Sequence, residues 1–386
     1  MGSQSAPFVL FRNDFDATSV LFSEPREIVM ARDGRELAAA FERLERARDE
    51  GLWSAGFVSY EAGFFFDEAL AARAEKKTGM RTPLLCFGLF DGPQTESVAL
   101  EPMRGDGAFM SGLEPDWDMP TYAEKFAVLH DHLCVGDCYQ GNLTFPIRGH
   151  WRGDALSAFE GLGARQPVRY GACVTLCEPN LVSRSPELFF QVDRDGWIET
   201  HPMKGTAPRH ADPAADVAEI RKLKEDEKSQ AENRMIVDLL RNDISRVSAV
   251  GTLDVPALFE VETYPTLHQM ISRVRARLLP GTTIHDIFAA LFPCGSITGA
   301  PKISAMEILD DLETAPREAY CGAIGYVAPG GEMRFNVAIR TISLFEDGEA
   351  VFNVGGGIVF DSRAEAEYEE ALLKARFAAG DTWISR

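Results

Sequence analysis

The strongest constraint on the fold is a series of strand-like segments near the C-terminal end, separated by tight glycine turns. Residues 322–327, 333–345 and 350–354 are rich in β-branched and aromatic side chains. Turns at Pro329-Gly330-Gly331 and Asp347-Gly348 divide them. The pattern predicts an antiparallel meander, followed by Gly355-Gly356-Gly357 and a helix over about 364–379 that stops at Gly380.

The rest of the chain alternates helix and strand signals without a clean domain boundary. Helices are expected over about 36–50, 122–134, 215–241, 284–291 and 303–312. Strands are expected at 56–60, 84–90 and 139–145, and a hairpin is expected to join 189–192 to 197–200. Residues 204–214 are rich in glycine, threonine, proline and histidine, which predicts a loop. The first third holds no cluster of reactive side chains and is expected to act as scaffold.

The charge balance argues against a nucleic acid or an anionic membrane as partner. The 386 residues include 39 basic and 59 acidic side chains, for a formal net charge of -20. No run of lysine and arginine offsets this charge, so a long electrostatic contact with a polyanion is disfavoured. The N-terminus has no signal-peptide pattern and no stretch of eighteen apolar residues occurs, so a cytoplasmic enzyme is expected.

The seven cysteines are scattered, which is typical of reduced thiols rather than of a disulfide framework. Cys134/Cys138 and Cys173/Cys177 each have a four-residue spacing. No second pair of histidines or cysteines completes the spacing of a zinc site. We therefore interpret these thiols as small core residues.

The last helix carries the first candidate for chemistry. Glu367, Glu370 and Lys374 lie at positions i, i+3 and i+7 and therefore share one stripe of this helix. Two carboxylates one turn apart can reach one magnesium ion, which prefers oxygen ligands. The alternative is a solvated face with an ordinary Glu370–Lys374 pair.

Two further charged residues interrupt apolar surroundings. Glu232 lies where the expected helix 215–241 changes from charged to apolar, so its carboxylate needs a partner. Arg340 lies within Val337-Ala338-Ile339-Arg340-Thr341-Ile342, which is otherwise typical of a buried strand. Its guanidinium should pair either with a protein carboxylate or with the carboxylate of a ligand.

Glycine-rich loops and one lysine complete the candidates. The loops at 295–299 and 355–357 can present backbone N–H groups to an anion, or can serve as turns only. The first loop lacks the spacing of a nucleotide-binding phosphate loop. Lys204 stands where an expected strand ends in a glycine loop, and a partly desolvated amine there can act as a nucleophile, although a lone loop lysine is ordinarily solvated.

Taken in order, these segments resemble the chorismate-utilising enzymes. The similar motifs lie at Ser185-Pro186-Glu187-Leu188-Phe189, Met203-Lys204-Gly205-Thr206, 226–228 through Asn242-Asp243, 292–302, Tyr320-Cys321-Gly322, 338–341, 355–359 and 367–370. They cover about residues 120–380, and residues 56–62 extend a weaker match. The resemblance implies one α+β domain over 1–386, a large β-sandwich of two mixed halves with helices packed outside. Residues 1–115 would form its weakly matching scaffold part and residues 116–386 its catalytic core.

The resemblance also assigns roles to individual residues. It implies that the carboxylates around Mg²⁺ are Glu232, Glu367 and Glu370, and that Glu187 is a general acid with a raised pKa. The residues that it places around the substrate are Arg340, Tyr320, Gly355, Lys374, Ser296, Gly205 and Gln140. Arg340 and Tyr320 would hold the pyruvyl carboxylate of chorismate, and the metal would bind the ring carboxylate.

Particular residues then indicate the branch that forms 4-amino-4-deoxychorismate for p-aminobenzoate and folate synthesis, aminodeoxychorismate synthase component I. Gln140 stands where similar isochorismate-forming enzymes have a lysine base. Lys204 stands where anthranilate synthases carry alanine, and Gln269 replaces a histidine that they carry. The branch implies that Lys204 is a nucleophile. Ser229 stands where many anthranilate synthases have another glutamate, which leaves the number of carboxylates around the metal open.

No glutamine-hydrolysing segment occurs in the sequence. The resemblance therefore implies that ammonia reaches the enzyme from solution or from a separate glutamine amidotransferase subunit. One alternative is anthranilate synthase component I, which would form an aromatic amine. A second alternative is a non-catalytic subunit that binds chorismate or an amino acid, which has no reason to keep Lys204, Glu187 and the acidic stripe together.

Overall fold

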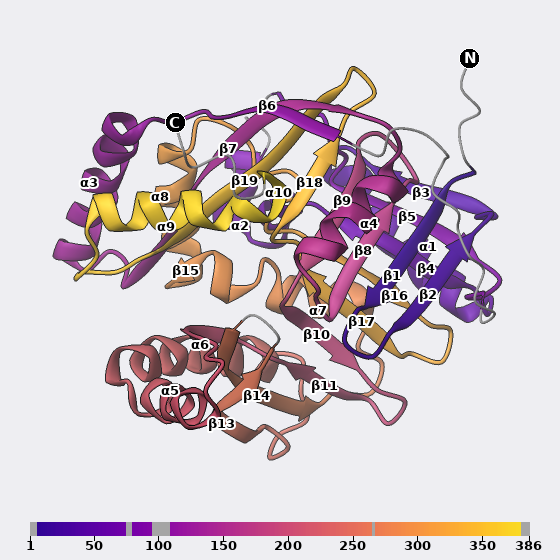
Figure 1. The fold of residues 1–386 in the computed structure, drawn as a ribbon. Helices are drawn as coiled ribbons and strands as arrows, with labels where there is room; N and C mark the ends of the chain where they lie inside the picture. Colours follow the sequence, from indigo (N-terminus) through magenta and orange to yellow (C-terminus); the bar gives the residue numbers. More distant parts are fainter. Residues whose placement is uncertain (1–5, 75–78, 95–108, 265–266, 380–386) are drawn as a thin grey trace.

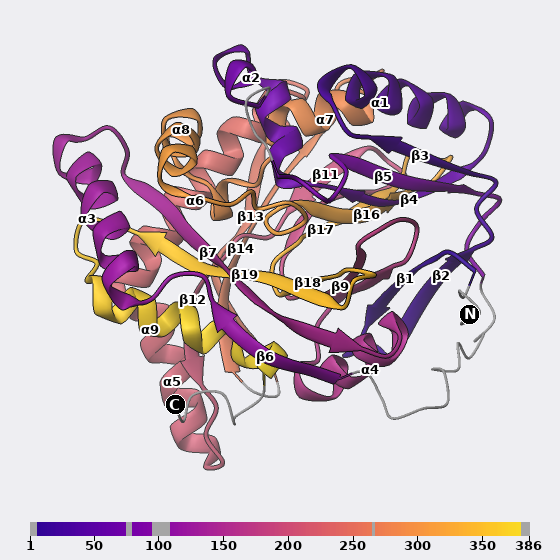
Figure 2. The ribbon, with the colours of Figure 1, turned by 90° about the horizontal axis from the view of Figure 1, so that it is seen from above.

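Two antiparallel sheets packed face to face form the centre of the molecule (Figures 1 and 2). The computed structural model describes residues 6–74, 79–94, 109–264 and 267–379. Strands from the N-terminal third enter both sheets, so this third is built into the same sandwich as the rest of the chain. The architecture is the α+β sandwich that the sequence predicts.

The first sheet has the order β15-β7-β19-β18-β9-β8-β1-β2, and β6 pairs with β7 outside this path. Its central ladder joins β19 to β7 over ten residue pairs, from Glu349↔His150 to Ile358↔Gly141. The strands, as the structure describes them, are β1 (Phe8–Asn13), β2 (Thr18–Ser23), β6 (Phe109–Pro115), β7 (Gln140–Arg152), β8 (Tyr170–Val174), β9 (Asn180–Ser185), β15 (Gly299–Ala300), β18 (Thr341–Leu344) and β19 (Glu349–Ile358).

The second sheet has the order β12-β14-β11-β10-β17-β16-β4-β5-β3, and β13 pairs with β14. The expected hairpin at 193–196 joins β10 to β11, where Gly196 adopts a φ of 77°. The described strands are β3 (Glu27–Ala31), β4 (Trp53–Val58), β5 (Leu85–Phe90), β10 (Leu188–Val192), β11 (Trp197–Thr200), β12 (Met203–Pro208), β13 (Asp254–Thr263), β14 (Leu267–Arg277), β16 (Ala323–Val327) and β17 (Met333–Val337).

Helices cover the outer faces of both sheets (Figures 1 and 2). Helices α1, α6 and α7 cover the second sheet, and α3, α4, α8 and α9 cover the first. The helical segments are α1 (Gly34–Asp49), α2 (Glu68–Ala74), α3 (Met119–Val135), α4 (Ala155–Arg165), α5 (Pro213–Glu225), α6 (Glu227–Ser245), α7 (Ile284–Leu291), α8 (Lys302–Leu312), α9 (Ala364–Lys374) and α10 (Arg376–Ala379), with 3₁₀ turns at Tyr60–Phe66 and Gly295–Ile297.

The hydrophobic core forms three layers, as this arrangement requires. Between the sheets, Val9 and Phe22 of the first sheet pack against Phe57 and Cys86 of the second. The two outer layers lie between each sheet and its helices. Burying one large apolar side chain stabilises the fold by roughly 1.5–3 kcal/mol, so these layers fix the strands on which the polar residues stand.

Local sequence signals set several helix ends. Asp118 caps α3 by accepting a hydrogen bond from the Thr121 amide, and Gly136 ends that helix with a φ of 85°. Thr283 and Asp286 form a reciprocal capping box at the start of α7. The expected stop of the last helix at Gly380 lies outside the described residues.

The structure corrects two expectations about element boundaries. The helix predicted over 215–241 is divided at Asp226, which ends α5 and caps α6 by accepting a 2.7 Å hydrogen bond from the Ser229 amide. The predicted strand 333–345 is also divided, because β17 belongs to the second sheet and β18 to the first. Periodicity could not reveal this crossing, since both parts are equally apolar.

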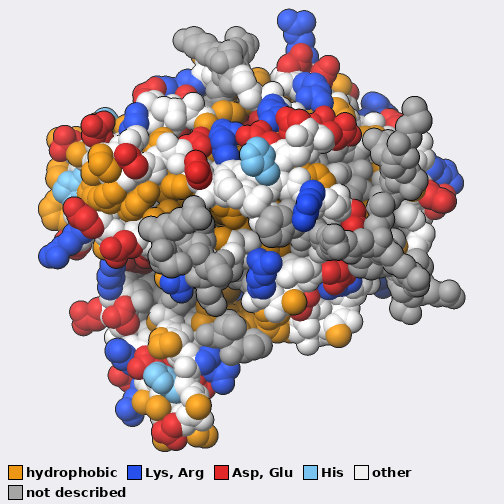
Figure 3. All heavy atoms as spheres, turned by 45° about the horizontal axis from the view of Figure 1, so that its top comes forward, with side chains coloured by type: hydrophobic (Ala, Val, Ile, Leu, Met, Phe, Trp, Pro, Cys, Tyr) orange, Lys and Arg blue, Asp and Glu red, His pale blue; other side chains and the backbone are white. Residues whose placement is uncertain are grey.

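The surface agrees with the charge argument. On the face shown in Figure 3, basic and acidic side chains are interspersed rather than separated into a continuous basic patch. In the part of the chain that the structure describes, no helix has the length and apolar character needed to cross a membrane.

Candidate functional site

Elements far apart in the sequence bring the predicted reactive groups into one electrostatic neighbourhood. Lys204 lies on β12, labelled in Figure 2, which pairs with β14 and packs against α6. The charges that act on the Lys204 amine come from Lys374, Glu187, Glu232 and Glu370. The structure therefore brings together the nucleophile candidate, the acid candidate and the acidic stripe.

The surroundings of Lys204 favour its neutral amine. Desolvation lowers the pKa of Lys204, and the nearby ammonium group of Lys374 lowers it further. The carboxylates of Glu187, Glu232 and Glu370 oppose this shift. Lys204 was expected in a loop, but it stands in β12, whose residues Met203 and Thr206 pair with β14 on either side of it.

Glu187 occupies the bend between β9 and β10 and is buried. Its carboxyl Oε1 accepts a 2.8 Å hydrogen bond from the Ser296 hydroxyl. Burial raises the pKa of Glu187 to about 7, although this hydrogen bond and the positive charges of Lys204 and Arg340 lower it. A carboxyl with this pKa is a proton donor near neutral pH, whereas an ordinary glutamate is ionised there.

The acidic stripe of α9 lies against the glycine triplet of β19. A Cβ atom added at Gly356 would lie 3.3 Å from Glu367 Oε2 and 3.4 Å from Lys374 Nζ. The Lys374 ammonium donates a 2.9 Å hydrogen bond to the Gly355 carbonyl and forms a 2.9 Å ion pair with Glu370. Glycine at 356 thus lets the tips of two charged side chains approach the strand.

Glu232 approaches the same group from α6. It pairs with Lys228 at 3.9 Å, and the charge of Lys228 also acts on Glu367 and Glu370. Burial raises the pKa of Glu367, and the neighbouring Glu370 adds to this shift. Lys228 is therefore a cation whose charge acts on all three glutamates.

The donor chemistry of these glutamates fits a hard divalent cation. Carboxylate oxygens are the ligands that Mg²⁺ prefers, and the mutual repulsion of Glu367 and Glu370 would be relieved by a cation between them. Within the described ranges, however, no three acidic, histidine or cysteine side chains converge closely enough to form a metal centre as they stand. The magnesium site stays a prediction.

Gln140, at the first position of β7, has a buried polar group without a partner. Its side chain is 1% exposed, and its Nε2 atom finds no hydrogen-bond acceptor among the described residues. A Cβ atom at Gly357 would lie 3.1 Å from this amide, so the amide packs directly on the glycine triplet. Buried unpaired donors are costly and favour a ligand or water nearby.

Arg340 is not inside a strand, contrary to the expectation. It lies in the crossing between β17 and β18 with a φ of 52°, which non-glycine residues adopt only rarely. Desolvation lowers the pKa of its guanidinium to about 10, and the charge of Glu187 opposes this shift. Of the carboxylates among the described residues, only that of Glu187 acts on the charge of Arg340, and it does so without a hydrogen bond, which favours the ligand among its two predicted partners.

The pattern of these residues matches a known family along almost the whole chain. The chorismate binding enzyme family covers residues 7–380. The chain belongs to this family.

Two curated relatives are 43% and 45% identical to this chain over the region that aligns. Aminodeoxychorismate synthase component 1 of Klebsiella aerogenes is 43% identical over 289 residues, which cover 74% of this chain and 64% of that protein. The protein of the same name from Salmonella typhimurium is 45% identical over 273 residues, which cover 71% and 60%. The matches thus span less than two thirds of these relatives.

A solved structure of the family shows the same fold. Anthranilate synthase component I from Streptococcus pneumoniae TIGR4 superimposes with a TM-score of 0.77 at 24% identity, over 97% of this chain and 93% of that one. At this identity the likeness establishes the sandwich architecture and leaves the reaction to the site residues.

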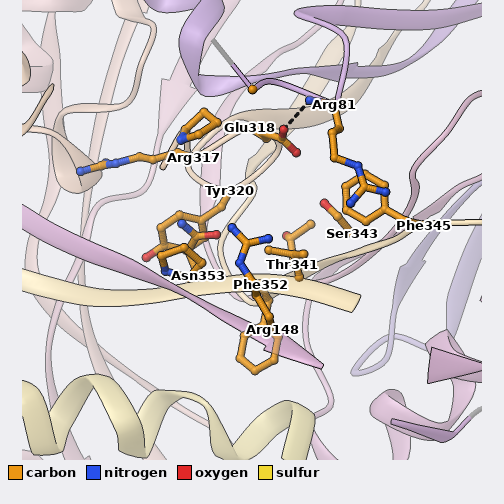
Figure 4. A pocket seen from close by; sticks show the side chains of 14 residues that line it. Arg81, Arg148, Arg317, Glu318, Tyr320, Thr341, Ser343, Phe345, Phe352 and Asn353 are labelled. Atoms are coloured by element: carbon orange, nitrogen blue, oxygen red, sulfur yellow. Dashed lines mark hydrogen bonds between the residues drawn. The ribbon is translucent and has the colours of Figure 1, made fainter. Parts of the chain in front are cut away.

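Tyr320, a further predicted contact of the substrate, lines a cavity of about 60 Å³ (Figure 4). The cavity is also lined by Thr341 and Asn353, which are close in sequence to Arg340 and Gly355. Burial raises the pKa of Tyr320, and the charges that act on it are those of Cys321, Arg317 and Glu313. No interaction joins Tyr320 to Lys204 or Glu187 within the residues described, so its predicted role gains no geometric support.

Two contributors to the site were not singled out from the sequence alone. Lys228 stands one turn before Glu232 in α6, and this i,i+4 spacing was the available signal for their pairing. Gln269 was noted only as a substitution, but its side-chain amide donates a 2.8 Å hydrogen bond to the carbonyl of Gly205, next to Lys204. This hydrogen bond joins two strands that are distant in the sequence, so the local sequence of neither strand predicts it.

Proposed function

We propose that this chain aminates chorismate at ring carbon 4 with ammonia and forms 4-amino-4-deoxychorismate, the precursor of p-aminobenzoate and folate. The observation that carries the proposal is that a lysine whose pKa is lowered and a glutamate whose pKa is raised to about 7 lie near enough for each charge to act on the other. Membership of the chorismate-binding family and the two aminodeoxychorismate synthase relatives support it.

In the first half of the reaction, the neutral Lys204 amine attacks ring carbon 2 of chorismate. The ring double bonds shift and the bond from carbon 4 to its hydroxyl breaks. Glu187 donates the proton with which this hydroxyl leaves as water. The lysine nitrogen gives up its own proton and remains bound to carbon 2 as a secondary amine.

In the second half, ammonia attacks carbon 4, the double bonds shift back, and the bond from carbon 2 to the lysine nitrogen breaks. The new amine on carbon 4 gives up a proton and the leaving lysine nitrogen takes one up, so the neutral amine of Lys204 is restored, and the product keeps its enolpyruvyl group. Splitting the substitution in this way replaces one difficult step by two easier ones.

The remaining residues bind and orient the dianionic substrate. Arg340 would hold one carboxylate by two parallel hydrogen bonds, and Gln140 would supply its unpaired amide. Glu232, Glu367 and Glu370 would hold Mg²⁺, which when bound would neutralise the second carboxylate. Ser296 keeps the Glu187 carboxyl in place, and a glutamine amidotransferase subunit would supply the ammonia.

Two measurements on the purified chain test the proposal. With chorismate and Mg²⁺ but no ammonia, intact-mass analysis should show a covalent adduct on the wild type, absent in Lys204→Ala and retained in the control Lys222→Ala, whose lysine is 79% exposed. The same adduct on Lys204→Ala would reject the covalent role.

With ammonium chloride added, the product should be 4-amino-4-deoxychorismate. A fluorescent aromatic amine formed without any added lyase would instead identify the anthranilate synthase reaction. Binding of chorismate without its consumption, by a chain shown to be folded, would identify a non-catalytic subunit.

A further inference from the structure

Lys204 stands at an irregularity in its sheet. The pairing of β12 with β14 runs from Met203↔Ile271 to Thr206↔Gln269, so three steps along β12 match two steps along β14. The extra residue makes a β-bulge that contains Lys204 and Gly205. Gly205 adopts a φ of 88°, which the bulge requires and which a residue with a side chain adopts only with strain.

A side chain of the facing strand closes this bulge. Gln269 Nε2 donates a 2.8 Å hydrogen bond to the Gly205 carbonyl, the group that follows Lys204 in the chain. The amide thus takes the place of the regular ladder bond that the bulge displaces. Gly205 is half-buried, so its carbonyl needs a hydrogen-bond donor. If Gln269 did not donate, regular pairing of β12 with β14 would supply a backbone donor instead, and the bulge would be lost.

Helix α6 holds the bulge from the other side. A Cβ atom at Gly205 would lie 2.9 Å from Ser229 Cβ, so the first turn of α6 lies directly on this peptide. The same helix is fixed to β14 by the 2.6 Å hydrogen bond from the Ser272 hydroxyl to Asn233 Oδ1, both of which are buried. The Gly205 peptide is therefore held between Ser229 and Gln269.

The direction of the Lys204 side chain depends on this bulge. Side chains alternate between the two faces of a strand, so a shift of one residue in register turns each side chain to the opposite face. If the bulge were lost, Lys204 would move away from Glu187 and from the carboxylates of α9. The amine and its electrostatic neighbours would then no longer meet.

We propose that Gln269 is a positioning residue, which holds the Lys204–Gly205 bulge so that the Lys204 amine faces Glu187 and the acidic stripe of α9. The inference rests on the proposed function only where it concerns the reaction of that amine with chorismate. Its structural part, the direction in which the amine is held, can be tested without any substrate.

The test measures the titration of Lys204 by competitive acylation with acetic anhydride across pH, followed by mass analysis of the Lys204 peptide. Gln269→Leu and the unbranched Gln269→Met remove the donor at similar volume. We expect either variant to raise the labelling midpoint of Lys204 by about one pH unit, because the amine leaves its desolvated position. Gln269→His, which restores a donor, should bring the midpoint back toward that of the wild type.

A matched control is Gln191→Leu on β10 of the same sheet, where the side-chain oxygen of the glutamine accepts a 3.3 Å hydrogen bond from Arg334. Its Lys204 midpoint should equal that of the wild type. The inference is overturned if folded Gln269→Leu and Gln269→Met titrate like the wild type, or if Gln191→Leu shifts the midpoint equally. Absence of a chorismate adduct on the wild type would reject the nucleophile and leave the titration to decide this inference.

The functional part of the inference has its own readout. In both donor-removing variants the lysine adduct should form at least about tenfold more slowly at pH 7, with KM for chorismate unchanged, because substrate binding does not use Gln269. The loss should persist when the pH is raised, because deprotonation makes the amine neutral but does not return it to its position. Full recovery of the rate at high pH would contradict a positioning role.

Discussion

The Ser296 hydroxyl donates a 2.8 Å hydrogen bond to Oε1 of Glu187, a carboxyl that is buried and whose pKa is about 7. This bond favours the ionised form and so works against the burial that raises the pKa. The 3₁₀ turn that carries Ser296 therefore sets the proton affinity of a residue more than one hundred positions earlier in the chain.

Ser296→Ala should move the alkaline limb of the pH–rate profile to higher pH, by roughly half to one pH unit, which is what one hydrogen bond contributes. The sign follows from the role of the acid, because the active form is protonated and the variant keeps its proton to higher pH. The control is Ser304→Ala, whose hydroxyl bonds to the carbonyl of Asp137. An unchanged limb, or a shift to lower pH, would show that Glu187 is not the group titrating.

Glu187 should also make the free energy of unfolding depend on pH. Its pKa is raised in the folded state, so the contribution of the protonated carboxyl to the free energy of unfolding is fully present at low pH. This contribution is lost as the pH rises toward about 7. Glu187→Gln keeps the acceptor for Ser296 but removes the charge. In urea unfolding, the free energy of unfolding of Glu187→Gln relative to that of the wild type should increase between about pH 4 and pH 7 and then level off. The total increase should be on the order of 3 kcal/mol.

The comparison variant for this measurement is Glu369→Gln, which changes an exposed glutamate of α9. Its stability relative to the wild type should be nearly constant over the same pH range. If Glu187→Gln behaves in the same way, then the buried carboxyl does not titrate near pH 7 in the folded state.

The order of the motifs allowed the fold to be predicted from sequence, and the same motifs supplied the candidate residues of the site. The periodicity of α9 was sufficient to place Glu367, Glu370 and Lys374 on one stripe, because helical spacing depends only on sequence. The hairpin around Asp193 followed from local turn chemistry in the same way.

The surroundings that give these residues their properties could not be predicted. The apolar run from Met333 to Phe345 contains no signal that β17 and β18 enter different sheets, so Arg340 was expected within a strand. Likewise, the bulge at Lys204 depends on its pairing with Gln269, more than sixty residues later. The backbone at Arg340 and the bulge at Lys204 both depend on pairing between strands that are distant in the sequence. Local sequence carries no signal for this pairing.

The predicted magnesium site can be tested without measuring turnover. After removal of metal with EDTA, added Mg²⁺ should raise the Tm of the wild type, because a ligand that binds only the folded state stabilises it. Glu367→Gln and Glu370→Gln should weaken the apparent affinity in this titration by about tenfold or more. Glu369→Gln should leave it unchanged, and equal weakening in all three variants would argue against a site at these two glutamates.

Lys302, which follows the loop that superficially resembles a phosphate loop, is expected to be structural. Its ammonium donates hydrogen bonds to Asp243 Oδ2 at 2.7 Å and to the carbonyl of Leu291 at 2.8 Å. Both charged side chains are largely buried, with exposed fractions of 12% and 5%. The pair fixes the start of α8 against the end of α6, and with it the turn that presents Ser296.

Lys302→Met should therefore destabilise the protein by roughly 3–5 kcal/mol at pH 7, because it leaves the Asp243 carboxylate buried without its partner. The loss should shrink as the pH is lowered, since burial already raises the pKa of Asp243 and protonation then removes the unpaired charge. The double variant Lys302→Met/Asp243→Asn should regain much of the stability, whereas Lys222→Met at an exposed position should change little. Urea unfolding at pH 5 and pH 7 checks these values, and a Lys302→Met variant as stable as Lys222→Met would show that the ion pair does not hold the loop.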